Sequence, residues 1–197
     1  CNSNQLASLD LSQNTSLTIL ISYSNQLTSL DLSQNTALTQ LSCEVNQLTS
    51  LDVSNNTALT FLNCRSNQLT SLDVSNNTAL TTLTCILNQL TLLDVRNGNN
   101  QNLLNFNVFS NPNLTCINVD NVTYSTTNWT NIDAQHYFST NCTPPLPQTY
   151  VPDDNFEAYL EANGMGNGIA NDDSVTTSNI NTITSLDVSS QTISDLT

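Results

Sequence analysis

The chain has 197 residues, of which 38% are hydrophobic, 6% aromatic and only 9% charged, and its formal net charge is −14 at pH 7. Its Lys and Arg content is two residues, Arg65 and Arg96. Nucleic acids and anionic membrane surfaces are bound mainly through many Lys and Arg side chains, so this composition excludes both as partners. No apolar run approaches the roughly 20 residues that a membrane-spanning helix needs, so we expect no membrane insertion.

A repeat of 21 residues dominates the first half of the chain. Copies begin at Leu38, Leu59 and Leu80 and have the form L-x-x-L-x-C-x-x-N-x-L-x-x-L-D-V-x-x-N, with small departures. Apolar residues alternate before each Asn, which predicts two strand-like edges and two bends in every copy. One copy cannot bury its apolar stripe alone, whereas stacked copies bury all of them in a continuous core. We therefore predict a leucine-rich-repeat solenoid, mostly β, with short parallel strands, few helices and a small α+β cap segment.

An Asn recurs at one position of the repeat. Its copies are Asn4, Asn25, Asn46, Asn67 and Asn88. A short amide side chain that points inward can both donate to and accept from unpaired backbone groups of a bend. We predict that these residues hold the bends of successive coils together.

The 21-residue unit resembles the IRREKO class of bacterial leucine-rich repeats, relatives of the internalin type, over about residues 1–118. Residues 111–142 are similar to the C-terminal cap of these secreted bacterial proteins, and residues 150–164 are similar to the helix that opens an N-terminal cap. The resemblance implies an extracellular or cell-surface binding and adhesion scaffold, not an enzyme.

These segments predict four parts of the chain. They are leucine-rich repeats at 1–110, a C-terminal cap at 111–143, a proline-rich linker at 144–149, and an N-terminal cap with the first strands of a second, truncated array at 150–197. In the second cap, Asp153 or Asp154 can be the N-cap of a helix that ends at Gly164. This order, and a first residue that is Cys1, favour a fragment that joins one array's C-terminal cap to a second array's N-terminal cap.

The six cysteines fall into two groups. Cys1, Cys43, Cys64 and Cys85 share one repeat position and are expected to be small, buried core residues. The other two, Cys116 and Cys142, lie off this ladder on either side of a poorly periodic segment. We predict a disulfide between them, which would close a loop of roughly 27 residues and stabilise the fold by about 3–4 kcal/mol. Such a bond requires an oxidising compartment, so we expect a secreted or cell-surface location.

One aspartate per copy forms a row on the second edge, which we call the Asp row: Asp10, Asp31, Asp52, Asp73 and Asp94. Stacked carboxylates about 5 Å apart repel each other, so something must compensate for their charge. Hydrogen bonds from the backbone and from neighbouring Ser and Thr hydroxyls are the first explanation. Bound Ca²⁺ is the second, with Asp31, Asp52, Asp73 and Asp94 as weak candidate ligands, although one Asp per coil makes an open row and not a cage.

The outward positions of the first edge are not repeated from copy to copy, whereas the second edge is almost constant. A surface that varies while its neighbours stay fixed, and that shows Ile, Tyr and Phe to water, is typical of a recognition surface; drift among tolerated surface residues is the alternative. We predict that this face binds an extracellular protein or polysaccharide through Ile19, Ile21, Tyr23, Gln40, Glu44, Phe61, Asn63, Arg65, Thr84, Ile86, Asn107 and Phe109.

Catalysis has few candidate residues in this sequence. His136 is the single histidine, and no Ser/His/Asp or Cys/His set can be built around it, so we interpret it as a surface or cap-packing residue and expect no enzymatic activity and no cofactor. A purely structural spacer in a large surface protein is the main alternative to binding. Rows of threonines, such as Thr18, Thr39, Thr60 and Thr81, leave an ice-binding solenoid as a minor one.

Overall fold

The computed structural model describes residues 1–142, 148–151, 153–165 and 174–176. The chain divides into two compact units, Cys1–Cys142 and Thr143–Thr197. Residues 144–147 of the predicted linker and most of the predicted second array lie outside the described residues, whereas residues 148 and 149 of that linker belong to a strand. The four-part division predicted above is finer than the two units and stays a prediction.

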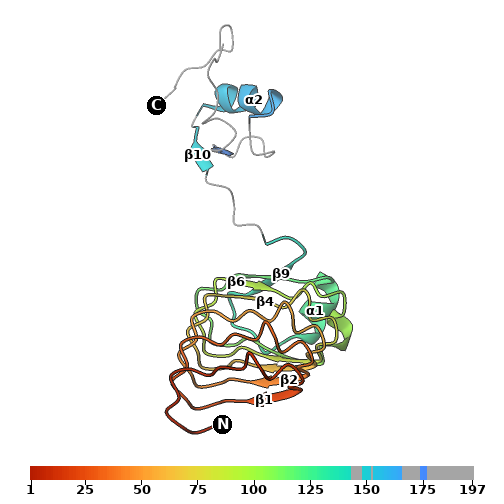
Figure 1. Ribbon diagram of the computed structural model, residues 1–197. Helices are drawn as coiled ribbons and strands as arrows, with labels where there is room; N and C mark the ends of the chain where they lie inside the picture. The colour runs from red at the N-terminus through yellow and green to blue at the C-terminus, as the bar shows by residue number, and fades with distance from the viewer. Residues whose placement is uncertain (143–147, 152, 166–173, 177–197) are drawn as a thin grey trace. The chain divides into compact units, whose positions relative to one another are not determined.

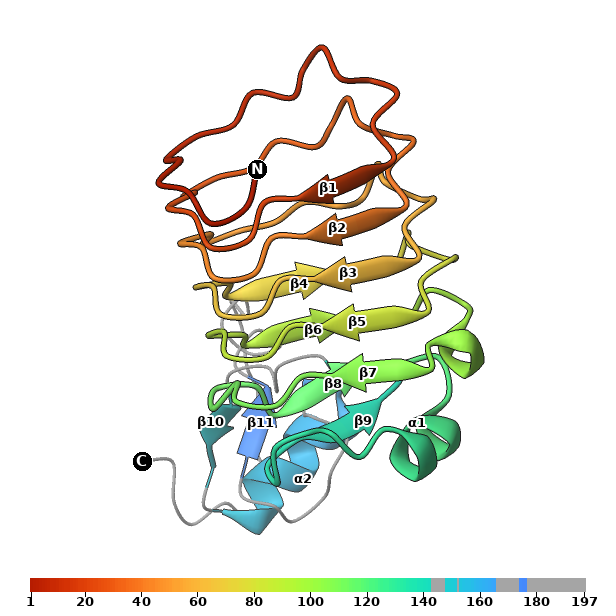
Figure 2. The same cartoon turned by 90° about the horizontal axis from the view of Figure 1, so that it is seen from below.

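The first unit is a leucine-rich-repeat solenoid with two parallel sheets (Figure 1). Its larger sheet, which we call the variable sheet, has one strand from each coil in the order β1-β2-β3-β5-β7. Neighbouring strands pair residue for residue one repeat apart, so that Leu20, Leu41 and Leu62 stack in one row (Figure 2). The strands are β1 (Ile19–Ile21), β2 (Gln40–Ser42), β3 (Phe61–Asn63), β5 (Thr82–Thr84) and β7 (Asn105–Asn107).

The second sheet is shorter than the sequence predicted. It comprises β4 (Ser71–Asp73), β6 (Leu92–Asp94), β8 (Cys116–Asn118) and β9 (Tyr137–Ser139). Residues 29–31 and 50–52, at the equivalent positions of earlier coils, are not strands, so a strand-like second edge in every coil was wrong. The pairing begins where Arg96 neutralises Asp94. We attribute the difference to repulsion between unneutralised carboxylates of successive coils.

Leucine, cysteine and valine side chains from every coil form one continuous core. Leu41, Leu62 and Leu83 are fully buried at the centres of their strands, and each contributes about 2 kcal/mol of hydrophobic stabilisation. Cys43 and Cys64 are also fully buried, whereas Cys1 is exposed. The ladder cysteines are therefore core residues except for Cys1, which lies in the first described coil at the end of the stack, so the prediction of burial was wrong there.

Burial also sets the chemistry of the core cysteines. It raises the pKa of Cys85 to about 12, and it raises the pKa of Cys43 and Cys64 well above the ordinary value. A thiol must ionise to act as a nucleophile or a metal ligand, so these thiols are unreactive in the folded protein near neutral pH.

The repeated Asn side chains bridge neighbouring coils as predicted. In Asn67 the amide nitrogen donates to the carbonyls of Cys43, Cys64 and Arg65 at 3.1, 3.1 and 3.3 Å. Its amide oxygen accepts the backbone N–H of Leu48 at 3.0 Å. Asn25, Asn46 and Asn88 repeat this pattern, while the first member, Asn4, is exposed and donates only within its own bend, to Asn2.

The cap covers the C-terminal end of the coil stack. It contains η1 (Asn100–Asn102) and α1 (Val122–Asn128), and the strands β8 and β9 continue the second sheet. Trp129 stacks on Phe106 with ring centroids 4.2 Å apart and lies edge-on to Phe138 at 5.7 Å. Cys116 and Cys142 form the predicted disulfide, with their Cα atoms 5.6 Å apart.

In the second unit, β10 (Gln148–Tyr150) and β11 (Ser174–Thr176) pair antiparallel. The helix α2 (Asp154–Ala162) packs its Leu160 with Val151 and Val175. Its N-cap is Asp153, whose carboxylate accepts the N–H groups of the first turn, and Gly164 follows its end with φ +71°. The predicted helix is therefore confirmed.

Ser22 occupies the ladder position that holds Cys in the next three coils. It is fully buried, and within the described residues its hydroxyl has no hydrogen-bond partner. We expect Ser22→Cys to raise the free energy of unfolding by about 1 kcal/mol, because it removes an unsatisfied polar group. Thermal unfolding measures this as a rise of roughly 3 °C in Tm. Ser22→Val should stabilise as well, since Val108 stands at this position in a later coil; loss of stability in both variants would refute the explanation.

Candidate binding face

The variable sheet brings the predicted binding residues onto one surface. Seven of them lie on its five strands, and the others follow two residues after a strand. All twelve are at least partly exposed. The inward and outward alternation of these short strands places them, because each central Leu or Phe is buried while its two neighbours face away.

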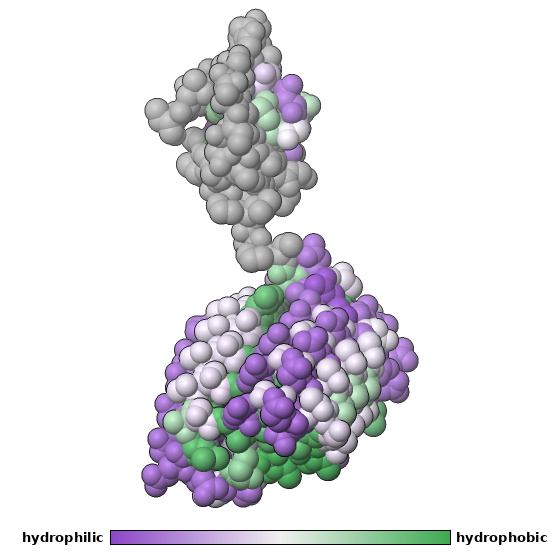
Figure 3. All heavy atoms as spheres, in the orientation of Figure 1, coloured by the Kyte–Doolittle hydropathy of each residue, from purple (hydrophilic) through white to green (hydrophobic). Residues whose placement is uncertain are grey.

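Large apolar side chains stand exposed on this face. Ile19 and Ile21, both in β1, are 48% and 45% exposed, and Phe109 beyond β7 is 53% exposed. Figure 3 shows apolar residues gathered over the end of the solenoid at which β1 lies. Such residues stabilise the folded chain little where they stand.

Two further apolar residues border the face and were missed from the sequence. Val45 and Leu87 are 49% and 45% exposed, and both have the left-handed backbone conformation, with φ of 54° and 56°. Ser24 and Ser66 occupy the same repeat position with the same φ. Because the conformation recurs at this position from coil to coil, the bend of the solenoid imposes it, and a β-branched residue such as Val45 is strained there. The substitution of Val or Leu for a recurring Ser, directly before the buried Asn, was the signal that could have revealed them.

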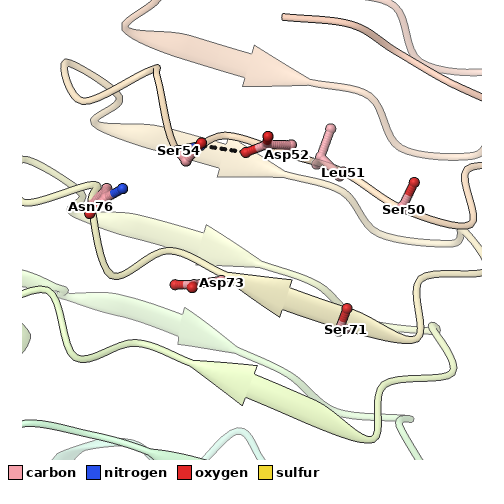
Figure 4. A pocket seen from close by; sticks show the side chains of 7 residues that line it. All are labelled: Ser50, Leu51, Asp52, Ser54, Ser71, Asp73 and Asn76. Atoms are coloured by element: carbon pink, nitrogen blue, oxygen red, sulfur yellow. Dashed lines mark hydrogen bonds between the residues drawn. The ribbon is translucent and has the colours of Figure 1, made fainter. Parts of the chain in front are cut away.

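The Asp row lies on the second edge of the coils, within the second sheet only at Asp73 and Asp94, and is held by local hydrogen bonds. Asp31 and Asp52 each accept the backbone N–H two residues ahead, from Ser33 and Ser54, at 2.9 Å. The carboxylate of Asp52 lies on the coil next to that of Asp73, and both line an opening of about 280 Å³ (Figure 4). The first explanation offered for the row, hydrogen bonding to neighbouring groups, is therefore present in the structure.

Arg96 completes the row at its last coil. Its guanidinium Nε donates to both carboxylate oxygens of Asp94 at 3.0 and 3.1 Å, and its Nη1 donates to the carbonyl of Thr140. Burial opposes ionisation of Asp94, but the hydrogen bonds and charge of Arg96 outweigh it and the pKa is lowered. The guanidinium of Arg96 is thus the cation that neutralises Asp94 at this coil.

Protonation of the Asp row at low pH should destabilise the folded protein. Hydrogen bonds from Ser12 and Ser33 lower the pKa of Asp10 and Asp31, and those from Ser54 lower the pKa of Asp52. A carboxyl with a lowered folded-state pKa stabilises above its unfolded value, near 3.8, and loses that contribution as the pH falls through the folded value. We expect the urea midpoint of unfolding to fall as the pH drops below the unfolded value, near 3.8.

The control for this pH dependence is the double variant Asp31→Asn and Asp52→Asn. It should lose less stability over the same pH interval, because two of the titrating groups are gone. If the double variant loses as much stability at low pH as the unaltered chain does, other carboxyls are responsible.

Calcium binding by the Asp row stays a proposal. Among the described residues no group of three or more His, Cys, Asp or Glu side chains converges, so the row offers pairs of carboxylates and not a closed cage. The opening between Asp31 and Asp52, about 220 Å³, also contains Ser33 and Asn56 as oxygen donors. Titration with calcium chloride followed by calorimetry tests the proposal directly.

Other candidate residues have structural roles. The hydroxyls of Thr39, Thr60 and Thr81 each donate to the carbonyl of the Thr one coil earlier, at 2.9 to 3.1 Å. Ice binding by this row stays a prediction. The hydroxyl hydrogens of these threonines already form hydrogen bonds within the protein. His136 is buried in the cap, where Nδ1 accepts the N–H of Asp133 and Nε2 donates to the carbonyl of Asn111. The interpretation of His136 as a cap-packing residue is confirmed.

Comparison with solved structures gives a partial likeness. No protein-family model matches the chain, and no curated protein matches it. Among the part of the chain that the structure describes, no helix is long and apolar enough to cross a membrane. The fold is similar to the functional domain of InlJ from Listeria monocytogenes, described as including a cysteine ladder, with 30% identity and a TM-score of 0.48. That likeness covers 60% of this chain, which spans about a third of the matched chain, 33%.

Proposed function

We propose that the protein is an extracellular recognition scaffold that binds a macromolecular partner through the variable sheet. The observation that supports this proposal best is the exposure of Ile19, Ile21 and Phe109 on a sheet whose interior positions are regular and whose outward positions differ in each coil. Val45 and Leu87 add two more exposed apolar side chains, three residues after the strands of the same coils. A broad sheet face suits an extended protein or polysaccharide better than a small molecule.

The proposed location rests on the Cys116–Cys142 disulfide, because such bonds persist in oxidising compartments. The resemblance of the repeats to secreted bacterial, internalin-related proteins supports the same location, and adhesion is the role that the resemblance suggests. No catalytic activity is proposed.

The alternative is a structural spacer whose repeats set only a distance. A spacer needs a soluble surface, which the repeated Ser and Asp residues of the second edge supply, and a continuous core, which the buried Leu, Cys and Val residues supply. It gains nothing from exposed isoleucines or from a Val in a strained backbone conformation, so the variable sheet favours binding.

The test uses the immobilised full chain and fractionated extracellular proteins and polysaccharides. We expect Tyr23→Ala, Phe61→Ala and Arg65→Ala, combined in one variant, to weaken capture of the bound component at least 10-fold without changing the melting temperature. All three side chains are at least partly exposed on the variable face. The matched control combines Ser29→Ala, Asn55→Ala and Asn76→Ala, which are exposed on the side of the Asp row. Equal capture by the unaltered chain and both variants would refute the binding face.

A further inference from the structure

A polar pocket lies where the last strands of the variable sheet meet the cap. Its volume is about 330 Å³, near the lower end of the range for small-ligand sites. Two adjacent strands, β5 and β7, supply one side, and the segment 128–131 after α1 supplies the other. The lining residues are Thr82, Thr84, Leu104, Asn105, Phe106, Asn107, Asn128, Trp129, Thr130 and Asn131.

Seven of the ten lining residues are neutral and polar, and the other three are Leu104, Phe106 and Trp129. Four of the lining residues carry amides and three carry hydroxyls, and no charged side chain is among them. An anionic ligand is disfavoured, because neither Arg65 nor Arg96 lines the pocket and the chain carries a net charge of −14. A cation would find no carboxylate here. An apolar ligand would leave the amides without partners, which costs free energy.

Two of the amides have their hydrogen-bonding capacity free. Within the part of the chain that the structure describes, the side chains of Asn107 and Asn131 make no hydrogen bond to protein atoms, while that of Asn105 makes a long one, 3.4 Å, to the hydroxyl of Thr82. An Asn side chain offers two donors and one acceptor with two lone pairs, and a Thr hydroxyl offers both functions. The pocket therefore presents donors and acceptors close together.

The backbone under these side chains is fixed. The carbonyl of Asn107 accepts the N–H of Cys85 at 3.0 Å, and the carbonyl of Asn131 accepts the N–H of Val108 at 3.2 Å. Below them Trp129, only 3% exposed, stacks on Phe106 and donates its indole N–H to the carbonyl of Leu103 at 3.1 Å. A site held in this way loses little conformational entropy when a ligand binds.

We propose that this pocket binds a neutral oligosaccharide. Every sugar hydroxyl both donates and accepts a hydrogen bond, which matches a lining of Asn and Thr, and a sugar ring also has C–H faces that can contact the exposed Leu104 at the rim. The proposal deepens the proposed function, on which it rests, by giving a ligand class to the cap end of the variable sheet. The pocket does not include the exposed apolar residues Ile19 and Ile21 of β1.

The test offers the full chain an array of neutral oligosaccharides of two to six residues, built from glucose, galactose, mannose or N-acetylglucosamine, and measures the best ligand by calorimetry. We expect the double variant Asn107→Ala and Asn131→Ala to weaken that binding at least 10-fold. Thr84→Val, which keeps the shape and removes one hydroxyl, should weaken it several-fold, and this milder variant keeps the test valid if the double variant unfolds. Gln68→Ala, an exposed amide outside both the pocket and the predicted binding face, should bind as well as the unaltered chain.

Each contrary result has a distinct meaning. Failure of all neutral oligosaccharides to bind at millimolar concentration would overturn the proposal, as would binding that the pocket variants leave unchanged. Binding of unglycosylated peptides that depends on Asn107 and Asn131 would assign the pocket to protein recognition instead. Retained oligosaccharide binding in the Tyr23, Phe61 and Arg65 variant, whose three positions lie outside the pocket, would support the pocket independently of the rest of the variable face, so the two proposals can fail separately.

Discussion

Replacing Asn67 with Asp is expected to lower the free energy of unfolding by about 4 kcal/mol. The side chain is 8% exposed, and its amide nitrogen donates to three carbonyls from two neighbouring coils. A carboxylate has no N–H to donate, so an oxygen atom would face the carbonyl oxygens of Cys43 and Cys64 in a buried site. Breaking a buried network and burying an unpaired charge are among the mechanisms that give the largest destabilisations by single substitutions.

The matched control is Asn76→Asp, which makes the same chemical change at an exposed position of the second edge. Substitutions at such positions usually change stability by less than about 0.5 kcal/mol. Urea-induced unfolding of the three proteins measures the difference, and Asn67→Ala should fall between them, because the N–H of Leu48 then loses its acceptor but no charge is buried. Equal midpoints for the two Asp variants would show that the ladder does not hold the coils together.

The solenoid could be predicted because the repeat pattern itself requires successive copies to stack. An Asn, a Cys and three or four leucines return every 21 residues, and only stacking puts such residues into a common interior. The same reasoning located the disulfide, since Cys116 and Cys142 are the two cysteines outside the ladder. Local pattern and overall fold agree at these positions.

The features that were missed depend on contacts between distant segments or on backbone conformation. Val45 resembles any surface valine in the sequence, and only its φ of 54° distinguishes it. The polar pocket combines β5, β7 and the segment 128–131, which come together only when the cap folds onto the last coil. The second edge was expected to pair in all coils because its sequence is constant, yet pairing begins at β4, near the coil where Arg96 meets Asp94. A repeat pattern describes what coils share, whereas these features arise where they differ.

Removing the Cys116–Cys142 bond is expected to lower the free energy of unfolding by about 3.5 kcal/mol. The bond joins residues 26 apart, and a cross-link of this span reduces the entropy of the unfolded chain by that amount in the chain-entropy picture. We expect the variant with Cys116→Ala and Cys142→Ala to melt roughly 10 °C below the unaltered chain. Reductant should lower the melting temperature of the unaltered chain to the same value and leave that of the variant unchanged.

Thiol labelling distinguishes this bond from the ladder. In denaturant without reductant, four cysteines should react with an alkylating reagent, namely the free Cys1, Cys43, Cys64 and Cys85, and reduction should expose the other two. Labelling of all six without reductant would contradict the disulfide.

The destabilisation caused by removing the Cys116–Cys142 bond should be largest at the cap end of the solenoid. The loop that the bond closes carries Trp129 and Phe138, which cover Phe106 of the last coil. In a stack of coils each coil is stabilised mainly by its neighbours, so an end that loses its cover opens before the interior does. Hydrogen exchange in the double Ala variant should therefore accelerate at Ile117 and Phe106 more than at Leu41, near the other end of the core. Uniform acceleration along all coils would mean that the solenoid unfolds as a single cooperative unit and that the cap protects every coil equally.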